Sequence, residues 1–144
     1  MAACDMAVAA EGAGFCLSET RIGLIPATIG PYVVRAMGRR AAQRYLLTAE
    51  RFDAAEAHRL GLVHTVVAAD GLDAAVDGLV QALRAAGPQA VRACKRLLRE
   101  VADRPVDDAL IARTVEGIAE IRASDEGRAG VSAFLAKQAP PWLP

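Results

Sequence analysis

Apolar residues recur at helical spacing throughout the second half of the chain. Between residues 72 and 83 they fall every third or fourth position, which places them on one face of a helix. The residues of this stripe are Leu72, Ala75, Val76, Leu79, Val80 and Leu83. Gly87-Pro88 ends this helix and begins the next, because proline suits the first turn of a helix.

Two further apolar faces and a short terminal helix follow. The first face comprises Val91, Cys94, Leu97, Leu98 and Val101; the second, after Pro105, comprises Leu110, Ile111, Val115, Ile118 and Ile121. Ser124 is an N-cap candidate for a last helix over residues 125–137. The proline-rich segment 140–144 is not compatible with helix.

The first half of the chain has a mixed pattern. Residues 5–10 and 15–17 are short apolar runs separated by a glycine-containing turn, and residues 62–67 are rich in β-branched side chains, so all three are predicted strands. Helices are predicted over residues 31–37 and 41–48, with Gly38 between them.

A third helix of this half is predicted to begin at Asp53 and to end at Gly61. Asp53 and Glu56 have the spacing of a capping box, and glycine suits the residue after a helix. The change of pattern divides the chain into an α/β part, residues 1–67, and a helical part, residues 68–144. The apolar stripes of the helical part must pack on one another, on the α/β part or on a neighbouring subunit.

Composition narrows the class of protein. Seventeen basic and seventeen acidic residues cancel, so no global field favours nucleic acid or an anionic membrane. No apolar run approaches the ~20 residues that span a bilayer, and no secretory signal is visible. Three well-separated cysteines indicate small buried side chains in a reducing compartment, so we expect a cytoplasmic protein. With only His58 and His64 to join them, no metal-ligand spacing recurs, and no metal site is predicted.

One acidic residue, Glu19, lies between two apolar runs. The tripeptide Phe-Cys-Leu begins at Phe15, and an Ile-Gly-Leu-Ile-Pro run begins at Ile22. Such a glutamate is either a buried, partnered structural acid or a proton carrier in general acid–base catalysis.

The sequence around Glu19 resembles the enoyl-CoA hydratase/isomerase (crotonase) family. Ser18-Glu19-Thr20-Arg21-Ile22-Gly23-Leu24-Ile25-Pro26 is similar to the family's (Pro/Ser)-Glu-x-x-(Ile/Leu)-Gly-(Leu/Ile)-x-Pro turn. Ala3-Cys4-Asp5 resembles its Ala-x-Cys-Asp strand, and residues 47–57 with Gly61-Leu62-Val63 resemble its Leu-Thr-Gly-x-x-(Ile/Phe)-x-Ala-x-Glu-Ala and Gly-Leu-Val signatures. These ordered motifs cover most of the 144 residues.

The resemblance implies an α/β protein of crotonase (ClpP-like) fold, with the C-terminal part of the core followed by a helical trimerisation region. It implies an acyl-CoA thioester substrate, reversible hydration of a 2-enoyl-CoA in branched-chain (leucine) or fatty acid degradation, and assembly as a homotrimer or a dimer of trimers. Glu19 would protonate the α-carbon, and no cofactor beyond the substrate's CoA is expected. Two alternatives remain: an enoyl-CoA isomerase, and a non-catalytic oligomerisation module.

The family's terminal Ala-Phe-x-x-Lys segment is similar to Ala133–Lys137. By this resemblance Phe134 and Lys137 would reach the CoA site of an adjacent subunit, although a core contact and a solvated charge are the ordinary alternatives. A basic cluster on residues 92–99 is interpreted as a solvated helix face.

The chain departs from the family pattern in two places. The Gly-Gly-Gly-x-(Glu/Gly/Asp) run that precedes the Ala-x-Cys-Asp strand in the family is missing, and with it the oxyanion donors and the first catalytic glutamate. We therefore expect a fragment, a truncated product or a chain that needs a complementing partner, inactive by itself. Residues 27–35 also differ from the glycine-rich run of many members and look like the methylglutaconyl-CoA-type hydratases.

Overall fold

Two pairs of short strands organise the first half of the chain in the computed structural model, which describes residues 1–143. Strand β1 (Val8–Ala10) pairs in parallel with β4 (Thr65–Val67), with Val8 opposite Thr65. Strand β2 (Gly14–Phe15) pairs antiparallel with β3 (Phe52–Asp53). The three predicted strands are confirmed in shorter form, and β3 was not expected because two residues carry no alternation pattern.

Helix α1 (Gly30–Thr48) spans the two helical segments predicted on either side of Gly38. Gly38 interrupts it with φ 77° and ψ 156°, a conformation that residues with a side chain rarely adopt. The helix buries Val33, Met37, Ala42 and Tyr45. The glycine therefore bends α1 so that both segments contribute to one core.

Three aromatic rings lie together in this core. The centroid of Phe52 is 5.5 Å from that of Phe15 and 4.2 Å from that of Tyr45. The remaining buried members are mostly small: Ala9, Val33, Met37, Ala42, Ala54, Ala57, Leu62 and Val63. The core of the first half is thus built from the aliphatic-rich, aromatic-poor composition that the sequence offers.

A polar network joins α1 to α2 (Ala54–Arg59) beside this core. The Tyr45 hydroxyl donates a hydrogen bond of 2.8 Å to Glu56 Oε1, and Arg59 donates two of 2.6 Å to the same carboxylate. These hydrogen bonds lower the pKa of Glu56 to about 2, and those from Arg59 have a larger effect than the one from Tyr45. Asp53 accepts the N–H of Glu56 at 2.8 Å and Gly61 has φ 78°, so both predicted helix ends are confirmed.

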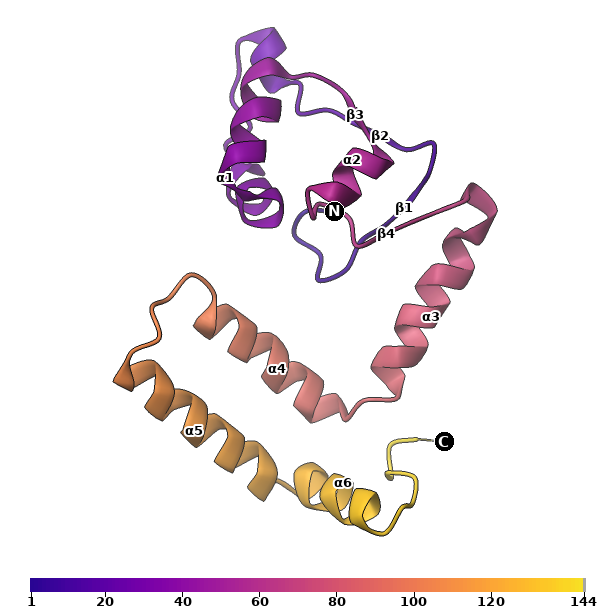
Figure 1. Cartoon of the computed structure of the whole chain (residues 1–144), viewed down its shortest axis with the longest axis vertical. Coiled ribbons are helices and arrows are strands. Elements are labelled where there is room, and N and C mark those ends of the chain that lie inside the picture. The colour runs from indigo at the N-terminus through magenta and orange to yellow at the C-terminus, as the bar shows by residue number, and fades with distance from the viewer. Residues whose placement is uncertain (144) are drawn as a thin grey trace. The chain divides into compact units, whose positions relative to one another are not determined.

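The rest of the chain is helical, as predicted. A 3-10 turn η2 (Ala69–Gly71) leads into α3 (Leu72–Arg84), which is followed by α4 (Pro88–Val101), α5 (Asp108–Ala123) and α6 (Asp125–Leu135) (Figure 1). Ser124 caps α6 through the N–H of Gly127 at 3.0 Å, which confirms the predicted N-cap. None of these helices, nor any other in residues 1–143, is both long and apolar enough to cross a bilayer.

Two long-range contacts tie the helical part together. Glu126, on α6, accepts the N–H groups of Gln89 at 2.9 Å and Ala90 at 2.8 Å, and so caps the start of α4. In the tail, the Trp142 indole N–H donates to the carbonyl of Ala85 at 3.1 Å. These contacts hold the helices by their ends rather than by a shared core.

By packing, the chain forms a first unit, Met1–Asp77, and a second unit from Gly78 onward, with the division inside α3. The domain boundary predicted after residue 67 stays a prediction.

Candidate active site

Glu19 begins a single 3-10 turn, η1 (Glu19–Ile22), in the first unit. Gly23 ends the turn with φ 76°, and its backbone N–H donates to the carbonyl of Thr20 at 3.3 Å. The N–H of Leu24 donates to the carbonyl of Glu19 at 3.0 Å. The glycine of the motif is therefore required by the left-handed conformation that closes this turn.

Side chains of the same segment contact the end of α1. Thr20 Oγ1 donates to the carbonyl of Leu46 at 3.2 Å, and Arg21 Nη2 donates to that of Ala49 at 2.5 Å. The thiol of Cys16 also lies 3.2 Å from the Ala49 carbonyl. The last carbonyls of a helix lack intrahelical partners, so these donors satisfy groups that would otherwise be unpaired.

The Glu19 carboxylate is half-buried, and its Oε2 is inaccessible to solvent with no hydrogen-bond partner in residues 1–143. An unpaired buried acceptor costs about 1–3 kcal/mol, so a hydrogen-bond donor of a bound group would be favoured at this atom. This environment differs from that of a partnered structural acid, one of the two interpretations of the sequence. The catalytic role of Glu19 stays a prediction.

The segment after Glu19 exposes apolar side chains. Ile22, Leu24 and Ile25 are all more than half exposed. Acid and apolar surface therefore adjoin along one stretch of backbone, an arrangement suited to proton transfer on a ligand with an apolar portion. Within residues 1–143 no three His, Cys, Asp or Glu side chains lie together in a way that could hold a metal ion.

Phe134 and Lys137 belong to the second unit, at the C-terminal end of α6. The Phe134 side chain is 78% exposed, and the N–H of Lys137 donates to the Phe134 carbonyl at 3.1 Å. Lys137 adopts φ 54° directly after the helix and is exposed. Both side chains are accessible to a ligand, and their role at CoA stays a prediction.

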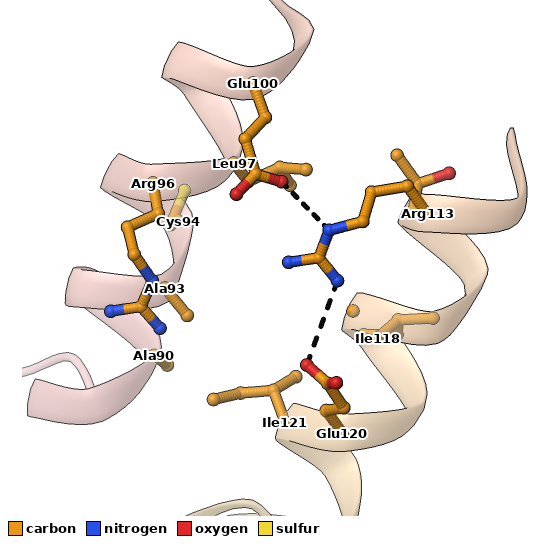
Figure 2. A pocket seen from close by; sticks show the side chains of 12 residues that line it. Ala90, Ala93, Cys94, Arg96, Leu97, Glu100, Arg113, Ile118, Glu120 and Ile121 are labelled. Atoms are coloured by element: carbon orange, nitrogen blue, oxygen red, sulfur yellow. Dashed lines mark ion pairs between the residues drawn. The ribbon is translucent and has the colours of Figure 1, made fainter. Parts of the chain in front are cut away.

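The second unit also contains a cleft between α4 and α5, with a volume of about 360 Å³ (Figure 2). Arg113 extends across it and pairs with Glu100 at 3.3 Å and Glu120 at 3.9 Å. Arg96, one member of the basic cluster, lines the cleft, while Ala93 and Ile121 are among its apolar residues. Apolar periodicity marked part of this lining, Leu97 and Ile121 included, but not its charged residues, which lie at positions typical of a solvated face.

Comparison with known proteins identifies the family. The family model described as enoyl-CoA hydratase/isomerase matches residues 1–143. The chain belongs to the enoyl-CoA hydratase/isomerase family. An enoyl-CoA hydratase of Shewanella pealeana of known structure is 48% identical, with a TM-score of 0.93 over 98% of this chain and 52% of that one. This likeness confirms the predicted crotonase fold.

Two curated relatives show how much of a family member the chain represents. Enoyl-CoA hydratase ACTT6 of Alternaria alternata is 35% identical over 91% of this chain and 44% of that protein. Mevalonyl-coenzyme A hydratase sidH of Aspergillus fumigatus is 34% identical over 100% of this chain and 54% of that protein. The hydratase/isomerase chain thus spans about half the length of the curated relatives it matches.

Proposed function

We propose that the protein to which this chain contributes is an enoyl-CoA hydratase, with Glu19 as the acid that protonates the substrate's α-carbon. The observation that carries the proposal is the half-buried Glu19 carboxylate, with Oε2 unpaired, on a turn bordered by apolar side chains. Membership of the hydratase/isomerase family supports it.

The reaction adds water across the double bond of a 2-enoyl thioester. The water oxygen bonds to the β-carbon, one of its O–H bonds breaks, and a proton from the Glu19 carboxyl group bonds to the α-carbon. Negative charge develops on the thioester oxygen in between and must be held by hydrogen-bond donors. No residue of this chain is assigned as such a donor, nor as the base that takes the proton from water.

The decisive test uses a chimera in which this chain replaces the matching 52% of the Shewanella pealeana hydratase. We expect the chimera to consume the enoyl thioester chromophore of crotonyl-CoA or of a branched glutaconyl-CoA. Glu19→Gln should lower turnover by about 10²–10⁴-fold, the usual contribution of a positioned proton carrier. Glu11→Gln, on an exposed loop residue, serves as the control. Near-normal turnover by a folded Glu19→Gln chimera would refute the assignment.

By itself the 144-residue chain should be almost inactive. One lost oxyanion donor costs about 10²–10³-fold, and neither donor is assigned within this sequence. Incubating the purified chain with the same two thioesters tests this expectation. Robust turnover would mean that the chain builds an oxyanion site from residues that we have not identified.

An isomerase is the second catalytic candidate, because a single carboxyl group can remove and return a proton as a double bond moves. The family's description names both reactions. Incubating the chimera with a 3-enoyl-CoA in deuterated water separates them. A hydratase leaves the 3-enoyl-CoA unchanged, because it needs a double bond conjugated to the thioester, whereas an isomerase converts it to the 2-enoyl-CoA.

We further propose that the second unit mediates assembly in threes, and that Phe134 and Lys137 contact the CoA of a neighbouring subunit. The exposed apolar side chains of α5, including Val115 and Ile118, support an assembly role. Sedimentation at micromolar concentration should give a trimer or a multiple of three. If the chain self-associates but the chimera shows no turnover, a non-catalytic oligomerisation module is the better description.

A further inference from the structure

We infer that Arg21 is a positioning residue for Glu19, which fixes the turn that carries this acid by binding it to the C-terminal end of α1. The inference rests on the proposed function of Glu19 and adds a residue to that site. It starts from an observation about Glu19 itself. No hydrogen bond within residues 1–143 holds the Glu19 carboxylate.

Because the carboxylate is not held directly, its place is set by the backbone from which it projects. That backbone is one 3-10 turn, closed by the N–H groups of Gly23 and Leu24. A 3-10 turn this short has no further helical turn of its own to support it, and its hydrogen-bond geometry is poorer than that of an α-helix. Its orientation therefore depends on contacts outside the turn.

Arg21 supplies the strongest of those contacts. Its guanidinium donates to the Ala49 carbonyl at 2.5 Å, whereas Thr20 donates to Leu46 at 3.2 Å. The charged donor meets the negative end of the α1 dipole, where a cation is favoured. Ala49 is fully buried and accepts this bond in a left-handed conformation with φ 50°, so the acceptor is itself fixed.

Arg21 lies two residues after Glu19, so its hydrogen bond to the end of α1 restrains the backbone that carries the Glu19 side chain. Losing the Arg21 contact would leave the turn with Thr20 as its remaining side-chain bond to α1. A catalytic group works within about 0.5 Å of its productive position, and a misplacement of about 1 Å can cost about 10²-fold in rate. Arg21 thus acts through Glu19 and need not touch the substrate.

The first experiment uses the 144-residue chain and three variants: Arg21→Met, Arg21→Lys and the control Arg40→Met. Arg40 is an exposed arginine of α1 with no described partner. In Arg21→Met we expect ¹⁵N order parameters of Glu19–Ile22 to fall from about 0.85 toward 0.6, and the ¹³C carboxyl signal of Glu19 to shift or broaden. Lysine can still donate to the Ala49 carbonyl, so Arg21→Lys should restore both signals, and Arg40→Met should leave them unchanged.

Unchanged signals in folded Arg21→Met would overturn the inference. If Arg21→Met does not fold, Thr20→Val, which removes the weaker bond to α1, should give the same changes with smaller amplitude. No change in folded Thr20→Val would equally overturn the inference that side-chain bonds to α1 fix this turn.

The second experiment separates this inference from the proposed function. In the chimera, Arg21→Met should lower kcat by about 10–100-fold with little change in KM, and Arg21→Lys should recover most of the loss. If Glu19→Gln abolishes turnover while Arg21→Met retains kcat per folded molecule, the positioning role is wrong and the proposed function stands. If Glu19→Gln is fully active, the proposed function fails, whatever Arg21 does to the turn.

Discussion

The first unit has a core and the second has almost none. Eleven of the twelve buried apolar residues among the described positions belong to the first unit, and Leu110 alone belongs to the second. The second unit instead exposes Val115 and Ile118 by 61% and 63%. The same helical amphipathicity therefore has two outcomes: α1 buries its apolar face within the chain, whereas α5 leaves most of its face uncovered.

The difference shows that a strong apolar stripe predicts a helix but not what covers it. In the first unit, small side chains and three aromatic rings in mutual contact fill the space around α1. In the second, end contacts such as the Glu126 cap hold the helices. Chemically similar substitutions should therefore change the free energy of unfolding by different amounts in the two units.

The largest difference in lost stability is expected between Phe52→Ala in the first unit and Ile118→Ala in the second. Phe52 is 7% exposed, stacks on Phe15 and packs at a tilt against Tyr45, so its truncation should cost about 3–5 kcal/mol of unfolding free energy. In the unassembled chain, Ile118→Ala should change stability by at most about 0.5 kcal/mol, because the side chain is exposed there. Denaturant unfolding followed by amide exchange reports on each unit. A comparable loss in Ile118→Ala would mean that its face is covered in solution, as the proposed trimer requires.

The second test concerns the pH dependence of the first unit. Arg59 and Tyr45 lower the pKa of Glu56 from 4.5 to about 2, so the folded state binds fewer protons than the unfolded state over this range. The stabilisation is therefore complete above pH 4.5 and is lost as the pH falls through about 2. Glu56→Gln should flatten this part of the acid-unfolding profile. An unaltered profile would contradict the network's role.

Sequence patterns predicted most of the fold. All the helices of the second unit and the interruption at Gly38 follow from apolar spacing and from the glycine and proline positions. The strands of the first unit proved shorter, and β3 was missed. A pair of two-residue strands is set by tertiary contact between Phe15 and Phe52, and such contacts leave no periodic signal.

The candidate site was predicted only in part. Glu19 was found through its motif, yet its unpaired Oε2 and the bond from Arg21 to Ala49 depend on the end of α1 lying beside η1. A cation two residues from a candidate acid is no signal by itself, because most arginines are solvated. The partner carbonyl lies 28 residues further along the chain, and only the fold brings it close.

A smaller effect is expected at the α4 cap of the second unit. Glu126→Ala removes the acceptor of two N–H groups and should cost about 1–2 kcal/mol of unfolding free energy. Glu116→Ala, on the exposed face of α5, is the control.

A substitution at Gly87 tests the same cap from the other side. A Cβ at Gly87 would lie 2.5 Å from Glu126 Oε1. Gly87→Ala should therefore destabilise the wild type more than the Glu126→Ala variant, and a double-mutant cycle measures the coupling. Additive effects would show that the cap is not formed.

The smallest effect is expected where the tail meets α6. A Cβ at Gly130 would lie 2.7 Å from the Trp142 ring, so Gly130→Ala must displace the tail or shift the helix. Alanine in place of an interior helical glycine otherwise gains about 0.5–1 kcal/mol, as expected for the control Gly78→Ala, whose position has open space. Trp142 is the sole tryptophan, so a red shift of its emission in Gly130→Ala reports its release from the Ala85 carbonyl. In a Trp142→Ala background Gly130→Ala should become stabilising, because the clash is gone. Equal effects of Gly130→Ala in both backgrounds would mean that the tail contributes nothing to the second unit, whose stability would then rest on its helix ends and on whatever covers its exposed faces.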